Sequence, residues 1–333
     1  MIYQDRIYGK IEIKEPVILE LIKSPSLQRL KGIDQAGYLP LQSKLLGFRY
    51  SEVEHNRFEH SLGVFILLKK FGASLKEQIA GLIHDVSHSV FSHCIDYALK
   101  EGSEKNHTYQ DRIFEDFVKN SEIPKILSKF GFDANYILEK HNFPLLEKEL
   151  PDLCADRIDY SFRTAVIYRE ANLKTINYFL NYFLIKKNSW VFKNLKSAKK
   201  FASLFFKMNK IYYSGFLSAV MFKTVGDTLK FALQKRYIKK EDLFTTDEKV
   251  INKIKKKSKE DKKLNLLFRR MQGKVKFENN PRNYDTLVFC KSRIVDPLIK
   301  INSQIKRLSK IDKIWAKIVT REFKPKGYFL KFK

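Results

Sequence analysis

The stretch AGLIHDVSHSVFSH, residues 80–93, determines how the rest of the sequence is interpreted. It places Asp85 directly after His84, and two further histidines follow at positions 88 and 93. His84 and His88 are four residues apart, so on a helix they share one face. Imidazole is the commonest metal ligand, and dense histidine beside carboxylate is typical of a metal-assisted site. The stretch therefore predicts that polar, metal-binding side chains gather here.

Two other segments carry matching residue types. HNRFEHSLG, residues 55–63, contains His60, and DLCADRIDYSFR, residues 152–163, contains Asp156. In the second segment, a helix would align four polar residues along one stripe, at spacings of three, four and seven: Asp156, Asp159, Tyr160 and Arg163. A solvated salt-bridge face is the alternative interpretation of that stripe. Because six of the seven histidines fall between positions 55 and 107, a common site explains them better than separate surface roles.

The composition predicts a mostly α-helical protein with a large core. The chain has 333 residues, 44% of them hydrophobic, and its 27 Phe and 16 Tyr supply large apolar side chains. Only 13 Gly and 9 Pro argue against a many-turned β architecture. That size allows one well-buried core or two smaller ones.

The cysteines and the apolar segments predict a cytoplasmic protein. The three cysteines are far apart and odd in number, which argues against a disulfide framework. The most apolar stretch, residues 213–222, is too short to span a bilayer, and the first residues lack the apolar core of a leader peptide. We therefore expect a reducing, cytoplasmic location and no membrane partner.

Charge divides the chain into two unequal halves. Residues 1–164 carry 22 basic and 24 acidic side chains, a net charge of −2, whereas residues 165–333 carry 42 and 13, a net charge of +29. This asymmetry favours a polyanion partner, and nucleic acid is the expected one. Of those 42 basic residues, 34 are lysines. The alternative is that these lysines lie on solvated surfaces, reflect genome composition and bind no partner.

Punctuation by proline and glycine, together with apolar spacing, predicts the order of elements. We expect a hairpin at 3–13, a loop at 37–56 and a basic stretch at 251–270 that is either a solvated helix or a partly mobile arm. Predicted helices cover 16–23, 27–36, 58–71, 76–86, 91–101, 108–120, 122–130, 144–164, 172–185 and 195–237. Strand-like alternation near the end predicts α+β structure there. The expected division is a catalytic lobe, 1–187, and a basic C-terminal region, 188–333.

The three motifs, in this order, resemble the HD superfamily of metal-dependent phosphohydrolases. The strings RFEHSLG, GLxHDxxHxxFSH and DRxDY carry that resemblance, and IYGKIEI (7–13) with SPSLQRLKGIDQAG (24–37) is similar to the deoxynucleoside triphosphate triphosphohydrolase branch. The resemblance implies an HD-domain helical bundle, with a smaller α+β region after it, and an enzyme that cleaves phosphate esters.

The resemblance also implies roles for individual residues. The metal ligands would be His60, His84, Asp85 and Asp156, holding a divalent ion among Fe, Mn, Mg, Zn, Co and Ni. Arg57, His88 and His93 would lie near the α-phosphate, with Arg157 and Tyr160 further along the triphosphate. His107, in the polar connection EKNHTYQD (104–111), would act with Asp96 as general acid. Gln35 would contact the sugar 3′-hydroxyl, and Tyr212 would pack against the sugar.

The sequence departs from this branch where the sugar and an activator would bind. Thr164, Leu204 and Ser214 stand at positions where the branch has Asp, Arg and His, and Lys23 replaces an acid of the activator site. Three hypotheses follow: a nucleoside triphosphate triphosphohydrolase, an HD-type phosphodiesterase or nuclease, and a polyanion-binding module with little turnover. A homo-oligomer is expected in each case.

Overall fold

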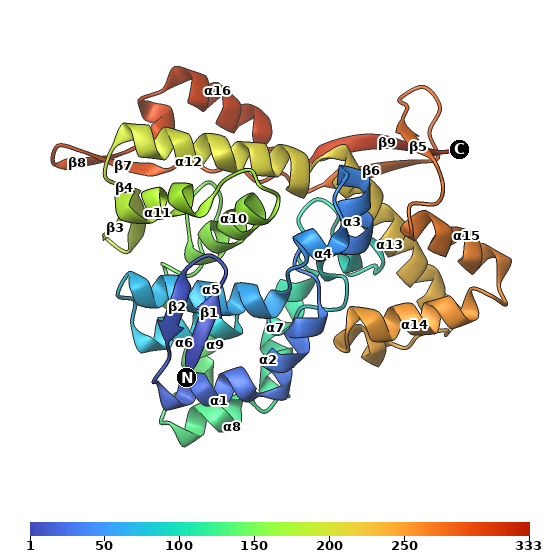
Figure 1. The fold of residues 1–333 in the computed structure, drawn as a ribbon, viewed down its shortest axis with the longest axis horizontal. Helices are drawn as coiled ribbons and strands as arrows, with labels where there is room; N and C mark the ends of the chain where they lie inside the picture. Colours follow the sequence, from blue (N-terminus) through green and yellow to red (C-terminus); the bar gives the residue numbers. More distant parts are fainter.

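The computed structural model describes residues 1–333 and is built mainly of helices (Figure 1). With 55% of residues helical, 16 α-helices and small sheets, it confirms the mostly α expectation with an α+β end. The first half opens with the antiparallel hairpin β1 (Ile2–Asp5) and β2 (Gly9–Glu12). Its helices and turns are α1 (Pro16–Lys23), α2 (Pro25–Arg29), η1 (Leu30–Gly32), α3 (Leu39–Leu46), α4 (Tyr50–Val53), α5 (Arg57–Lys70), α6 (Leu75–Ile83), η2 (Ser92–Tyr97), α7 (Tyr109–Lys119), α8 (Ile123–Lys129), α9 (Ala134–Leu138), η3 (Lys140–Asn142) and α10 (Ala155–Ile167).

The second half combines long helices with short sheets. Its helices and turns are α11 (Leu173–Tyr182), α12 (Leu195–Met208), the π-helical turn η4 (Asn209–Tyr213), α13 (Phe216–Gln234), η5 (Lys240–Phe244), α14 (Asp247–Lys257), α15 (Lys262–Met271), η6 (Leu308–Lys310) and α16 (Lys313–Glu322). Its strands are β3 (Phe183–Lys186), β4 (Ser189–Phe192), β5 (Phe277–Asn279), β6 (Thr286–Cys290), β7 (Leu298–Ile301), β8 (Gln304–Arg307) and β9 (Lys326–Phe332). They form a four-stranded sheet, β3-β4-β7-β8, and a three-stranded sheet, β5-β9-β6.

Helix α5 lies at the centre of the N-terminal half. Asn56 caps it by accepting the backbone N–H of Glu59, and most of its side chains are buried, including the polar Arg57 and His60 of its first turn. It packs against α6 and α10. Gly63 allows α5 to lie close to α10, because a Cβ there would lie 2.0 Å from the Arg163 guanidinium and 2.1 Å from the Asp159 carboxylate.

Two hydrophobic cores each draw on both ends of the chain. The larger core, of 50 buried residues, extends from Ile7 to Trp315, and the second, of 27, joins Tyr38 to side chains as distant as Leu330. Strand β4 pairs in parallel with β7, which ties the middle of the chain to its end. The predicted boundary at residue 187 falls in the turn between β3 and β4 and stays a prediction.

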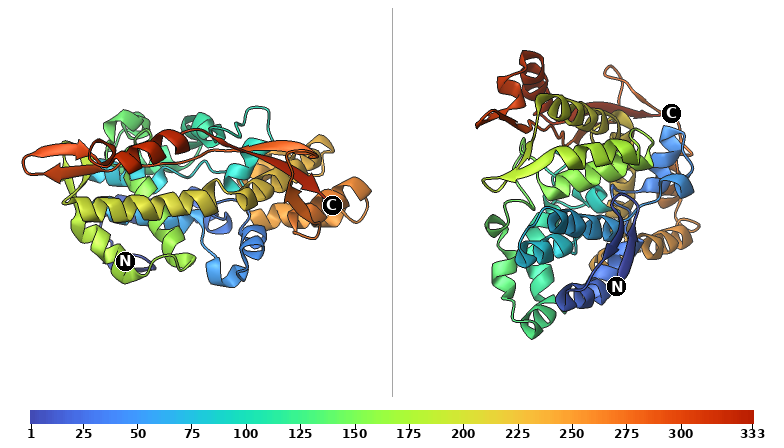
Figure 2. Two further views of the ribbon diagram at one scale, coloured as in Figure 1. Left: turned by 90° about the horizontal axis from the view of Figure 1, so that it is seen from above. Right: turned by 60° about the vertical axis from the view of Figure 1, so that its left-hand side comes forward.

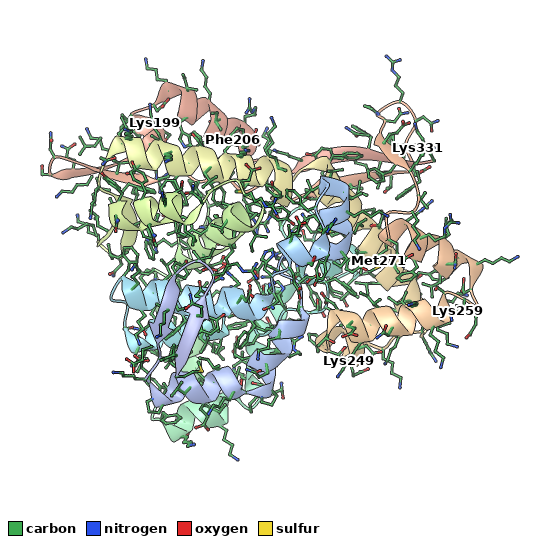
Figure 3. The ribbon with its side chains drawn as sticks, in the orientation of Figure 1. Lys199, Phe206, Lys249, Lys259, Met271 and Lys331 are labelled. Carbon is green, nitrogen blue, oxygen red and sulfur yellow. The ribbon has the colours of Figure 1, made fainter.

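The molecule is elongated, and α16 lies on the side opposite α1 and α8 (Figures 1 and 2). Helices α14 and α15 form a projecting pair, where Lys249 and Lys259 lie at the outer margin (Figure 3). The basic stretch at 251–270 is therefore helical, and Asp261 separates its two helices by accepting the backbone N–H groups of Lys263 and Leu264. No helix has both the length and the apolar character that a transbilayer segment needs.

Several expectations about elements are wrong. The predicted helix at 91–101 is the short 3-10 helix η2, the one at 172–185 gives way to β3 at Phe183, and the one at 195–237 is divided by η4. The predicted loop at 37–56 contains α3 and α4, because Pro40 near the start and Gly47 in a left-handed conformation at the end delimit a short helix whose buried side chains hold it. The predicted helix at 144–164 begins only at Ala155, since prolines at positions 144 and 151 interrupt the earlier part.

Candidate metal centre and active cavity

Three side chains from three helices converge at one point. His60 comes from α5, His84 directly follows α6, and Asp156 lies in the first turn of α10. Asp156 Oδ1 is 3.0 Å from His60 Nε2 and 3.6 Å from His84 Nε2. One ligand atom from each residue lies within 4.8 Å of the others, a spacing that one cation can bridge.

Asp85 borders the same point. Its carboxylate oxygens lie 3.4 Å from His84 Nε2 and 3.7 Å from His60 Nε2. Burial alone would raise the pKa of Asp85, but the Arg57 guanidinium, 2.7 Å away, and the neighbouring imidazoles hold it well below its usual range. Asp85 therefore presents a carboxylate to the centre, with one oxygen engaged by Arg57.

The tautomers of both imidazoles suit metal binding. His60 Nδ1 lies 2.7 Å from Asp159 Oδ2, and His84 Nδ1 lies 2.8 Å from the carbonyl of Gly81. Both acceptors require an N–H at Nδ1, which leaves the Nε2 lone pairs facing the centre. His84 Nε2 is buried without a hydrogen-bond partner. An orphaned buried acceptor beside two carboxylates is what a divalent cation would satisfy, so the residues fit such an ion.

A buried chain of charges supports His60 from behind. Asp159 Oδ2 also accepts from Arg163 Nε at 2.7 Å, and Arg163 Nη2 donates to Asp5 Oδ2 at 2.8 Å. These three side chains are at most 1% exposed. The Asp159–Arg163–Asp5 chain thus fixes the ring of His60 and links it to the N-terminal hairpin.

A cavity of about 830 Å³ opens beside the centre. Eight of the sequence-predicted residues that would contact substrate or act in catalysis line it: Gln35, Arg57, His88, His93, His107, Arg157, Tyr160 and Tyr212. Asp96 does not line it. Its Oδ1 accepts the backbone N–H groups of Ser103 and Tyr109, both at 3.1 Å, so it supports the loop that carries His107.

Three histidines form a row that leads away from the metal centre. His88 Nε2 lies 3.3 Å from Asp85 Oδ1, the rings of His88 and His93 are 5.1 Å apart, and those of His93 and His107 stack at 4.8 Å. Burial and the Arg57 charge lower the pKa of His88 to about 4, and the same causes hold the pKa of His93 well below its usual value. The first two members of this histidine row are therefore neutral near pH 7.

His107, at the far end, is held through both ring nitrogens. Its Nε2 is 3.1 Å from the Tyr97 hydroxyl, which donates to the carbonyl of Phe289 at 2.6 Å, so Nε2–H is the donor. Its Nδ1 accepts from Arg293 at 3.5 Å. Burial, His93 and Arg293 hold the pKa of His107 well below its usual value. The predicted role as a general acid stays a prediction.

The remaining predicted substrate contacts differ in whether their polar atoms already have hydrogen-bond partners within the protein. Gln35 is buried and its Oε1 has no partner, so it can still accept a hydrogen bond in the cavity. Tyr212 donates to Glu170 at 2.8 Å and packs against Tyr168. Arg157 donates to the carbonyl of Lys148 at 3.0 Å and to that of Asp152, which orients its guanidinium through the backbone.

The cavity-lining residues that sequence reasoning missed include Tyr213, Phe222, Lys291 and Arg293. The last two follow β6, which ends at Cys290, in the region near the end of the chain where strand-like alternation predicts α+β structure. The available signal was a pair of cations spaced by two in an otherwise apolar run. Only the tertiary fold brings this pair, some 130 residues after Asp156, to the site.

Comparisons with known proteins agree with this geometry. Residues 57–163 match the sequence model of the family described as HD domain. The uncharacterized protein YdhJ of Bacillus subtilis is 36% identical over 301 residues, which cover 90% of this chain and 89% of YdhJ. A solved structure of a hypothetical protein from Aquifex aeolicus shares the fold, with a TM-score of 0.73, 19% identity, and coverage of 100% and 96%.

Two relatives with named activities match only part of the chain. The metal-dependent phosphohydrolase cns2 of Cordyceps militaris is 40% identical over 50% of this chain and 46% of its own length. The deoxynucleoside triphosphate triphosphohydrolase SAMHD1 of Gallus gallus is 31% identical over 44% of this chain and 26% of its own. The chain thus spans less than half of either relative.

Proposed function

Because this chain belongs to the HD-domain family of metal-dependent phosphohydrolases, we propose that its cavity hydrolyses nucleoside triphosphates to nucleoside and tripolyphosphate. The cavity carries this proposal. Its volume of about 830 Å³ is within the range that accommodates small-molecule ligands. Besides Arg57, it is lined by Arg157, Lys291 and Arg293, none of which makes an ion pair with a carboxylate.

The metal ligands in this proposal are His60, His84, Asp85 and Asp156. When bound, a divalent cation supplies Lewis-acid polarisation of a phosphoryl oxygen and lowers the pKa of water. The chain's own residues position the substrate. Arg57, with Nη1 on Asp85 and Nε on Ser92, presents a fixed cation beside the centre. Neutral His93 offers its one N–H to a phosphate oxygen, and His88, whose Nε2–H faces Asp85, orients that carboxylate.

The reaction balances without any further reactant. The oxygen of one water molecule bonds to the α-phosphorus, the bond from that phosphorus to the 5′-oxygen breaks, and the 5′-oxygen takes a proton. His107, which is neutral in the resting site, is the proposed donor: it would take up the proton that the attacking water releases and pass it to the 5′-oxygen, while Asp96 supports its loop. Gln35 and Tyr212 are the proposed sugar contacts.

A second function has a specific observation in its favour. The branch that this chain resembles has an acid at the position of Thr164 to hold the sugar, and Thr164 lines the cavity here. Together with the net charge of +29 on residues 165–333, this favours an HD-type phosphodiesterase or nuclease. The converging ligands and the family membership argue against a module without turnover.

One experiment separates the two functions. Metal-reconstituted protein is incubated with ribo- and deoxyribonucleoside triphosphates, monophosphates and single-stranded oligonucleotides, and the products are separated by chromatography. Tripolyphosphate with nucleoside supports the first function, and shortened oligonucleotides support the second. Asp156→Ala is the control, since loss of a charged ligand should remove both bound metal and turnover. Sedimentation of the same sample tests the expected homo-oligomer.

A further inference from the structure

The segment after β6, far along the chain from the HD motifs, contributes two cations to the cavity wall. Lys291 and Arg293 line the cavity, and neither makes an ion pair. In extended chain, alternate side chains point to opposite sides. Ser292 and Ile294 are buried, at 6% and 0% exposure, whereas the two cations on the other side remain partly accessible. This arrangement turns both charges toward the cavity.

The segment is held rigidly in this position. Asn209, fully buried, donates from Nδ2 to Ser292 Oγ at 3.0 Å and accepts the backbone N–H of Arg293 at 2.8 Å. Asn209 begins the π-helical turn η4, whose Tyr212 and Tyr213 also line the cavity. One buried amide therefore fixes the cation pair and the aromatic wall relative to each other.

No carboxylate forms an ion pair with either cation. The Arg293 guanidinium contacts only the carbonyl of Lys291, at 3.3 Å, and His107 Nδ1, at 3.5 Å. Lys291 Nζ makes no hydrogen bond within the protein. Asp111 and Glu147 are the acids whose charges act on the pKa of Lys291, but each forms its ion pair with Lys140. Burial and the Arg293 charge lower the pKa of Lys291 to about 8.

The pair contacts the histidine row at its last member, counted from the metal ligands. The histidine row begins at Asp85, passes through His88 and His93, and ends at His107, which contacts Arg293. Three imidazoles thus separate the cations from the metal ligands. A chain of phosphates starting at the metal would be able to contact successive members of this row, which one phosphate would not.

We propose that Lys291 and Arg293 form an anion subsite for the phosphoryl groups of the substrate that lie beyond the one at the metal. Two cations held close together without a counter-ion are costly, and a bound polyanion offsets that cost. The planar fork of Arg293 suits phosphate oxygens. The subsite would select substrates with a phosphate chain over monophosphate esters. This inference rests on the proposed function for the identity of the substrate.

Binding of inorganic anions tests the subsite without turnover. The double variant Lys291→Gln/Arg293→Gln is compared with wild type by calorimetric titration with tripolyphosphate and with orthophosphate, in the same excess of Mg²⁺. The matched control is Lys300→Gln/Lys306→Gln, which removes two exposed charges from the β7–β8 hairpin, outside the cavity. We expect the cavity variant to bind tripolyphosphate at least about tenfold more weakly, with orthophosphate affinity nearly unchanged.

Three results would overturn the subsite: unchanged tripolyphosphate affinity in the cavity variant, an equal loss for both anions, or an equal loss in the control variant. Lys291→Gln alone is also tested, because its side chain makes no hydrogen bond that the change would break and the variant should fold. Arg293→Lys should retain most of the affinity. Failure of the proposed function would appear differently, as absence of nucleoside release by wild type while the difference in tripolyphosphate binding persists.

Discussion

Replacing Asp159 by Asn tests whether the buried charge chain controls the metal centre. Asp159 Oδ2 accepts from His60 Nδ1 and from Arg163 Nε, each at 2.7 Å. Asn keeps the shape but removes the negative charge that fixes the tautomer of His60. Loss of such a partner typically weakens metal affinity about 10–100-fold, which corresponds to about 1.4–2.8 kcal/mol.

The same change should also lower the free energy of unfolding. Breaking a buried ion pair costs about 3–5 kcal/mol, and Arg163 keeps Asp5 as a partner, so we expect the lower end of that range. Asp5→Asn is the matched control, because Asp5 contacts the same guanidinium at 2.8 Å but not His60. Both variants should lose stability, and only Asp159→Asn should lose metal affinity.

Calorimetric titration of chelator-treated protein with Mn²⁺ measures the affinity directly. Thermal unfolding with and without Mn²⁺ gives a second measurement, since a bound metal stabilises the native state according to its concentration relative to Kd. Equal affinities in wild type and Asp159→Asn would refute the reasoning. So would an equal loss in Asp5→Asn, because the effect would then come from general loosening of the fold.

Three further predictions concern other parts of the molecule. His107→Ala should lower turnover by about 10²–10⁴-fold with metal content unchanged, measured by steady-state kinetics and elemental analysis, and a change in KM alone would make it a binding residue. Asp34 and Asp247 are buried close together, where Asp247 accepts the backbone N–H of Asp34, and burial raises the pKa of both carboxyls. A raised pKa gives stability that is present below the ordinary carboxyl pKa near 4 and is lost as pH rises above it. The free energy of unfolding, measured by chemical denaturation, should therefore be lower at pH 8 than at pH 5, and Asp34→Asn should reduce this difference. An unchanged difference would contradict the assignment. The basic helices α14 and α15 should bind single-stranded nucleic acid, with an affinity that falls as salt rises. In filter binding, a variant with Gln at positions 255, 256, 257, 262 and 263 in place of Lys should show lower affinity and a smaller dependence on salt, with nucleotide hydrolysis retained. No binding by wild type at low salt would leave genome composition as the explanation of these lysines.

The parts of the fold that local sequence determines were predictable. Asn56 caps α5 and Ser74 caps α6, so the helices that position His60 and His84 follow from punctuation and apolar spacing. The start of α10, which carries Asp156, does not, because no side chain caps it. The spacing of His84 and Asp85 was visible in the same way, and the geometry brings them to His60 and Asp156.

The parts that depend on long-range packing were not predictable. Helix α3 is only eight residues long, and its stability comes from burial of Leu39 and Leu41 against distant elements. The cavity residues Lys291 and Arg293 belong to no recurring local pattern. Their position depends on β6 pairing with β9 and on the buried amide of Asn209, neither of which is encoded near them.

The way in which both cores draw on distant parts of the chain has a consequence for how the protein acquires its structure. The larger core is completed by Ile299, Leu308 and Trp315, so it is not fully buried until these residues have been synthesised. Contacts of such long sequence separation make folding slow and leave apolar surface exposed in the meantime. Folding during translation should therefore be late and should involve nearly the whole chain at once, and residues 1–187 expressed alone should aggregate.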